Sequence, residues 1–183
     1  MDHADHVNLL RPADLPSGGV WADFGAGSGA FTLALRELVG PHAKIYAVDK
    51  DRRALAQLDK THREMFTTSQ NLHAVQADFT GALSLPPLDG VVMANSLHYF
   101  KDKEKVLRHV RSFLKMSGML VLIEYNVDSG NVWVPHPLSF ETFRDLALRA
   151  GFSEPELLET VPSRFLREIY SAASYRNSID QSS

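Results

Sequence analysis

The residues best suited to chemistry form a glycine-rich turn between an apolar strand and a helix. From Asp23 to Ala30 the chain reads DFGAGSGA, directly after an apolar run that begins at Val20. Glycine accepts positive φ and has no Cβ, so the chain can reverse tightly and its amides can approach a ligand closely. The helix that begins near Ala30 adds unpaired N–H groups and the positive end of its dipole. The turn therefore predicts a nucleotide site whose ligand contacts Gly25, Ala26, Gly27 and Gly29.

Asp49 and Asp78 each follow a predicted strand, and Asp49 allows the glycine turn to be interpreted as a dinucleotide site. The pattern Gly25-x-Gly27-x-x-Ala30, with Asp49 at the end of the next strand, satisfies the dinucleotide fingerprint. A dinucleotide carries a pyrophosphate anion, however, and Asp23 directly precedes the glycines. An oxidoreductase would also need a substrate domain, for which no residues remain. An NAD-binding oxidoreductase is thus an alternative interpretation of the turn.

Length and composition limit the classes of protein that the chain can form. A chain of 183 residues can bury one substantial core but is too short for two ordinary domains, so we expect one domain over residues 1–176 and a frayed tail over 177–183. No apolar run approaches the ~18 residues that span a bilayer, which excludes a membrane-embedded protein. The first residues lack a basic start and an apolar stretch, so a cytoplasmic location is expected.

Charge and cysteine content exclude further chemistry. There are no cysteines, so disulfides, thiolate zinc sites and cysteine nucleophiles are absent. His3 and His6 have no third metal ligand in view and stand in a polar terminus that is expected to fray, so no metal is predicted. The net charge of −3 gives no electrostatic reason to expect a nucleic acid as partner.

Strand-like and helical segments alternate along the chain, which is typical of a parallel sheet covered on both faces. Helices are expected after the glycine turn, from Arg52 to about Met65, from Asp102 to the Ser117-Gly118 pair, and from Ser139 to Ala150. Residues 126–138 are predicted to form a long loop. The expected strands are 20–24, 44–49, 72–76, 90–94, 119–123, 156–161 and 164–172.

Taken in order, these segments resemble the class I S-adenosylmethionine-dependent methyltransferases over nearly the whole chain. Residues 23–29 are similar to the family's first motif, and residues 88–95 to its strand-four motif. Residues 114–119 look like the turn that precedes strand five, although Met116 and Ser117 depart from the usual Leu-Lys-Pro-Gly-Gly. The resemblance implies a Rossmann-like three-layer αβα sandwich, with a mostly parallel seven-stranded sheet whose last strand is antiparallel.

The resemblance also implies roles for individual residues. In the family, the acid at the position of Asp49 binds both ribose hydroxyls, and the acid at the position of Asp78 accepts from the adenine amino group. The donor carries a sulfonium and an ammonium, which three carboxylates at successive strand ends complement in charge. The expected S-adenosylmethionine site comprises Asp23, Gly25, Ala26, Gly27, Gly29, Asp49, Lys50, Asp78, Phe79 and Asn95.

Two residues after strand four are the catalytic candidates. His98 and Tyr99 should lie near the transferred methyl group, where His98 could act as a general base or pack beneath the substrate. The segment lacks the Pro-Pro-aromatic signature of enzymes that methylate adenine or glutamine amides. We therefore expect a small-molecule acceptor, and dimerisation could complete its pocket.

Two other functions stay open. A nucleic-acid or protein methyltransferase would keep the cofactor site and place a basic rim at its mouth. A catalytically silent scaffold would bind the cofactor without turnover. The basic residues that lie close enough together in the sequence to form such a rim are Lys101, Lys103, Lys105, Arg108 and Arg111.

Overall fold

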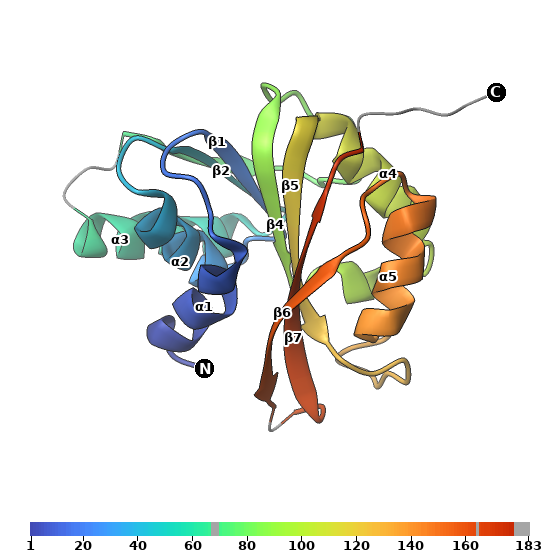
Figure 1. The fold of residues 1–183 in the computed structure, drawn as a ribbon. Coiled ribbons are helices and arrows are strands. Elements are labelled where there is room, and N and C mark those ends of the chain that lie inside the picture. The colour runs from blue at the N-terminus through green and yellow to red at the C-terminus, as the bar shows by residue number, and fades with distance from the viewer. Residues whose placement is uncertain (67–69, 164, 178–183) are drawn as a thin grey trace.

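A computed structural model describes residues 1–66, 70–163 and 165–177, so residues 178–183 of the expected tail lie outside the described part (Figure 1). The described strands form a seven-stranded sheet in the order β3-β2-β1-β4-β5-β7-β6. Their bounds are β1 Val20–Phe24, β2 Lys44–Asp49, β3 Leu72–Gln76, β4 Leu88–Ala94, β5 Leu114–Tyr125, β6 Glu156–Pro162 and β7 Glu168–Tyr175.

Strands β1 to β5 run parallel, and β7 pairs antiparallel with both β5 and β6. The expected Rossmann-like sandwich with an antiparallel last strand is confirmed. The helices are α1 His3–Leu10, α2 Ala30–Val39, α3 Arg52–Met65, α4 Lys103–Phe113 and α5 Phe140–Arg149, with short 3-10 turns η1 Arg11–Ala13 and η2 Leu97–Tyr99. Among the described residues, no helix has the length and apolar character needed to cross a bilayer.

The sheet is covered on both faces because its central strands bury alternate residues on opposite sides. In β5, Leu120 and Leu122 belong to the cluster that packs under α4 and α5, whereas Val121 and Ile123 belong to the cluster under α1 and α2. Successive strand residues point to opposite faces, so an unbroken apolar strand supplies both cores. Figure 1 shows the two helical layers, α1 to α3 on one side of the sheet and α4 with α5 on the other.

The N-terminal residues are ordered, in contrast to the expected fraying. Asp2 and Asp5 form a reciprocal capping box that starts α1. Leu9 and Leu10 are fully buried against α2 and the sheet. Because apolar residues anchor it, this segment is a packed helix.

Two expected boundaries are also wrong. Helix α4 ends at Phe113, well before the Ser117-Gly118 pair, because Leu114 already pairs with Leu88 in the sheet. The last strand begins at Glu168 and not near 164, because Ser163 donates its backbone N–H to the carbonyl of Arg167 and closes a turn there. Long-range pairing with β4 therefore sets the end of α4, whereas the turn between β6 and β7 sets the start of β7.

Gly90 provides a test of the packing between β1 and β4. A Cβ at this position would lie 2.1 Å from Cζ3 of Trp21, which is fully buried. We expect Gly90→Ala to lower the free energy of unfolding by roughly 1–3 kcal/mol, because the indole has no room to move. Denaturant unfolding measures the change. Gly81→Ala is the control, since its Cβ would meet only the Asp78 carbonyl at 3.4 Å; equal stability of the two variants would contradict this packing.

Candidate active site

The glycine turn joins β1 to α2 through backbone conformations that favour glycine. Gly25, Gly27 and Gly29 have φ values of 83°, 53° and 92°. A Cβ on Gly29 would lie 2.1 Å from Cδ1 of Leu58, whereas one on Gly27 would meet no described atom within 4 Å. Gly29 is therefore required for packing on α3, and Gly27 leaves open space that a ligand can approach.

Asp49 connects this turn to the end of β2. One carboxylate oxygen accepts the backbone N–H of Gly27 at 2.8 Å, and the other accepts that of Asp51 at 2.8 Å. Asp51, and not Asp49, caps α3 through its own side chain. Each carboxylate oxygen of Asp49 keeps a second lone pair, so the group can organise the turn and still accept hydrogen bonds from a ligand.

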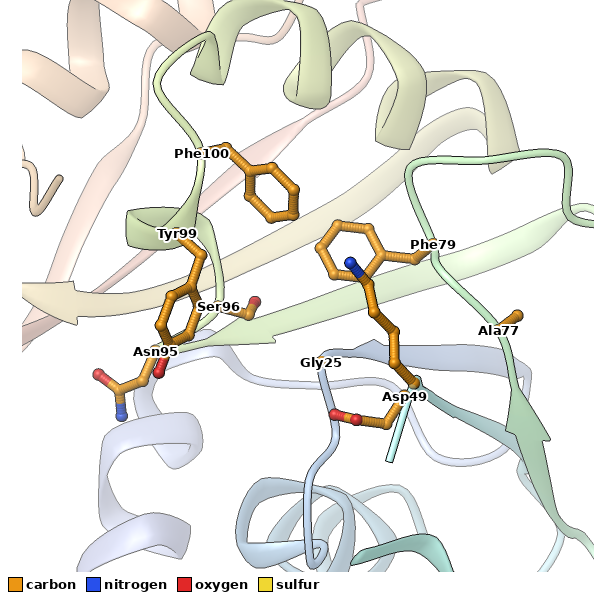
Figure 2. A pocket seen from close by; sticks show the side chains of 9 residues that line it. Gly25, Asp49, Ala77, Phe79, Asn95, Ser96, Tyr99 and Phe100 are labelled. Atoms are coloured by element: carbon orange, nitrogen blue, oxygen red, sulfur yellow. The ribbon is translucent and has the colours of Figure 1, made fainter. Parts of the chain in front are cut away.

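A cavity of about 250 Å³ opens beside Asp49 at the carboxyl ends of the parallel strands (Figure 2). It brings together six of the predicted residues: Gly25, Asp49, Lys50, Phe79, Asn95 and Tyr99. Three further lining residues, Ala77, Ser96 and Phe100, are neighbours in sequence of predicted ones. Figure 2 shows Asn95 and Tyr99 on one side of the cavity and Phe79 with Asp49 on the other.

Phe79 is both a core residue and a wall of the cavity. Only 5% of it is exposed, and its ring stacks on Phe24 with centroids 5.3 Å apart. Its other neighbour is Phe100, which meets it edge-on at 5.6 Å. The rings form a rigid apolar surface against which a flat heterocycle can pack.

Asp78 lies next to the cavity but does not line it. Its carboxylate forms an ion pair with Lys50 at 2.8 Å and accepts hydrogen bonds from the backbone and hydroxyl of Thr80. The hydrogen bond from Lys50, followed by those from Thr80, lowers the pKa of Asp78 to about 2. Lys50 thus occupies the carboxylate oxygen that the resemblance assigns to an adenine amino group.

Asp23 is buried beneath the turn and also lies outside the cavity lining. The Thr32 hydroxyl donates to its Oδ2 at 2.6 Å, while Oδ1 finds no donor among the described residues. Burial, reinforced by the nearby charge of Asp49, raises the pKa of Asp23 to about 7. Ala26, Gly27 and Gly29 likewise do not line the cavity.

Asn95 ends β4 in a left-handed conformation, with φ of 51°. Its backbone N–H donates to the carbonyl of Ile123 at 2.9 Å, which fixes it to the end of β5. Its side-chain oxygen is buried and has no donor among the residues that the structure describes. An unpaired buried oxygen beside a cavity is an acceptor that a bound cation can satisfy.

The two catalytic candidates are adjacent in sequence but differ in environment. Tyr99 is 62% exposed and lines the cavity. The side chain of His98 is 3% exposed, does not line the cavity, and contacts Glu124 Oε2 through Nδ1 at 2.9 Å. Sequence reasoning missed Glu124, although an acid within the apolar run of β5 was a signal.

The N-terminal histidines do not converge on a common site. His3 contacts Glu37 at 2.8 Å, whereas the His6 ring packs edge-on against Phe31 at 4.8 Å. Each histidine therefore has a separate packing role in α1.

The strand order, with β7 antiparallel beside β5, defines the Rossmann-like fold of a class I methyltransferase. A family model for the methyltransferase domain matches residues 22–120, which is more than half of the 183 residues. The chain belongs to this family. It is an S-adenosylmethionine-dependent methyltransferase.

Individual relatives agree with the family match. A probable cobalt-precorrin-6B C(15)-methyltransferase (decarboxylating) from Thermoplasma volcanium is 24% identical over 139 residues, which cover 76% of this chain and 67% of the relative. The YcgJ protein of Bacillus subtilis superposes with a TM-score of 0.77 at 13% identity, over 97% of this chain and all of that one. A SAM-dependent methyltransferase from Aquifex aeolicus gives 0.71 at 18% identity, over 96% and 94% of the two chains.

The raised pKa of Asp23 predicts a pH-dependent stability. From about pH 4 to pH 7 the folded chain holds a proton that the unfolded chain releases, so stability falls as pH rises through this range. Asp23→Asn removes this contribution, and the variant should lose less stability than wild type, by up to roughly 1.4 kcal/mol per pH unit. Denaturant unfolding of the cofactor-free protein at several pH values measures the slopes. The exposed Asp145→Asn is the control, and identical slopes for wild type and Asp23→Asn would contradict the assignment.

Proposed function

We propose that this enzyme transfers the methyl group of S-adenosylmethionine to a small-molecule acceptor. The supporting observation concerns the basic residues between positions 101 and 111. A nucleic-acid methyltransferase would need their charges at the mouth of its cofactor site. Lys103 is 8% exposed and donates to the carbonyl of Phe100, Arg108 pairs with Glu104, and Arg111 donates to the carbonyl of Gly151. These three side chains already have partners within the protein, so few of the basic residues remain to bind a phosphate backbone.

The net charge and one relative agree with this proposal. At −3 the chain as a whole does not attract polyanions. The Thermoplasma volcanium relative is described as acting on cobalt-precorrin-6B, which is a small molecule. From this relative we infer only that the acceptor is a small molecule.

The residues around the cavity suit the cofactor's parts. Asp49 would accept from the ribose hydroxyls, Phe79 would pack against the adenine, and the Asn95 side-chain oxygen would accept from the ammonium group. Asp78 lies next to the cavity, and its Oδ2, which pairs with Lys50, keeps a second lone pair that would accept from the adenine amino group. Asp23 would support the turn from beneath through its contact with Thr32 at the start of α2.

The bound cofactor supplies a methyl group already activated on a sulfonium, so the protein chiefly aligns the acceptor and excludes water. Tyr99 is the catalytic candidate that lines the cavity, and we assign it to contact with the acceptor or the methyl-bearing end of the cofactor. For His98 to act as a general base, its ring must reach the acceptor, although it is nearly buried.

Replacement of Asp49 tests the cofactor site. Asp49→Ala removes a charged acceptor for the ribose and a support for Gly27, so S-adenosylhomocysteine should bind more weakly by on the order of 2–4 kcal/mol. Titration calorimetry gives the affinity, and unfolding curves show whether the fold is kept. Asp59→Ala on the exposed side of α3 is the control. Unchanged affinity, or preferential binding of NAD, would reject this site.

The acceptor class is tested by following a labelled methyl group. We expect the label from S-adenosylmethionine to enter the small-molecule fraction of an extract, and RNA and DNA to bind weakly at physiological salt. Filtration by size separates the products. Tight, salt-sensitive RNA binding that stimulates methyl transfer would overturn the proposal in favour of a nucleic-acid methyltransferase.

A further inference from the structure

A fully buried carboxylate lies one strand away from the cofactor cavity. Glu124 sits near the end of β5 with no exposed surface. Its Oε1 accepts the backbone N–H groups of Leu97 and His98, at 3.0 and 3.1 Å. Its Oε2 contacts Nδ1 of His98 at 2.9 Å. A buried carboxylate is costly unless hydrogen bonds compensate for its lost water. Here the shorter contacts come from one short turn, and the backbone N–H of Tyr125 adds a longer hydrogen bond to Oε2 at 3.4 Å.

That turn is η2, which links β4 to α4 and has few other supports. Lys103 is a second anchor, because its ammonium donates to the carbonyl of Phe100 at 3.0 Å at the end of the turn. The loop after β5 adds a third, since the backbone N–H of His136 donates to the carbonyl of His98 at 3.0 Å. The turn is therefore held from β5, from α4 and from the loop, with Glu124 at its start.

The same turn carries two walls of the cavity. Tyr99 and Phe100 both line it, and Figure 2 shows the Tyr99 ring beside Asn95. The Tyr99 ring packs on the His98 ring, with centroids 4.3 Å apart. Because Tyr99 is 62% exposed, little other than the turn and this ring contact fixes its position.

We propose that Glu124 is a positioning residue of the methyl-transfer site, which holds Tyr99 at the cofactor cavity through the backbone and ring of His98. The carboxylate satisfies two N–H groups that would otherwise be buried without partners, and it orients the imidazole that supports the Tyr99 ring. The proposal rests on the cavity as the cofactor site, and it does not depend on which acceptor is methylated.

The charge of Glu124 also affects its other neighbours. Burial raises the pKa of Tyr125, and the charges of Glu124 and Tyr99 raise it further. The pKa of Lys103 is lowered by burial, against the opposing charges of Glu124 and Asp128. The ammonium of Lys103 thus partly offsets the buried negative charge of Glu124.

A double-mutant cycle on S-adenosylhomocysteine binding tests the proposal. Glu124→Gln leaves one good acceptor for the turn and sets an amide against His98, so Tyr99 should lose its position and affinity should fall by about tenfold. Tyr99→Ala should weaken binding to a similar extent. If Glu124 acts through Tyr99, the double variant binds no more weakly than the weaker single variant. Additive losses would show that Glu124 acts on the fold generally and would overturn the proposal.

Stability and a matched control accompany the cycle. Unfolding curves establish that each variant is folded at the temperature of the titration. Glu154→Gln replaces an exposed glutamate outside the site, and it should leave the affinity unchanged. Wild type that binds S-adenosylhomocysteine yet methylates no small molecule would reject the proposed acceptor class alone.

The His98→Ala variant provides a second test of the proposal if the Glu124→Gln variant does not fold. This variant keeps the carboxylate and both backbone hydrogen bonds but removes the ring beneath Tyr99. Affinity for S-adenosylhomocysteine should fall a few-fold, and the combination with Tyr99→Ala should bind no more weakly than Tyr99→Ala alone. Losses that add up in this combination would overturn the proposal. So would unchanged affinity together with a 100-fold loss of turnover and an altered pH profile, which would make His98 a general base.

Discussion

Carboxylates at the carboxyl ends of the parallel strands organise the loops on which this site depends. The strands β1, β2 and β5 each present one acid at that edge: Asp23, Asp49 and Glu124. A strand end there leaves the backbone N–H groups of the next loop in need of acceptors, and a carboxylate is the strongest acceptor that a side chain offers. Asp49 accepts one backbone N–H from the glycine turn and one from Asp51 before α3. Glu124 accepts those of Leu97 and His98 in η2 and, at 3.4 Å, that of Tyr125.

Asp23 and Asp78 differ in chemical character because their surroundings differ. Asp23 has a single hydroxyl donor and one oxygen without a described partner, and burial raises its pKa to about 7. Asp78, outside the core and beside Lys50, has its pKa lowered to about 2. Aspartates of one cofactor region thus hold protons very differently, because desolvation dominates in one case and an ion pair in the other.

Aromatic packing links the core of the sheet to the cavity wall. Phe24 at the end of β1 stacks on Phe79, which meets Phe100 after η2. This wall of the cavity is therefore an extension of the hydrophobic core, and its position is set by β1, the segment after β3 and the turn before α4. Such a wall needs no rearrangement before a flat ring packs against it.

The sequence by itself determined the order of the strands and of the helices from α2 onward, the glycine turn and the acid at Asp49, because these follow from local periodicity, backbone freedom and spacing. It missed α1, which is held by packing against α2 and the sheet. It identified six of the residues that line the cavity. It could not place the end of α4, which pairing with β4 decides, or the start of β7, which the turn between β6 and β7 decides. Nor could it tell that His98 turns into the core while Tyr99 faces the cavity, or that Lys103 serves the turn and not a basic rim. Those directions depend on Glu124, 26 residues beyond His98, whose buried charge requires donors that only the folded chain brings to it.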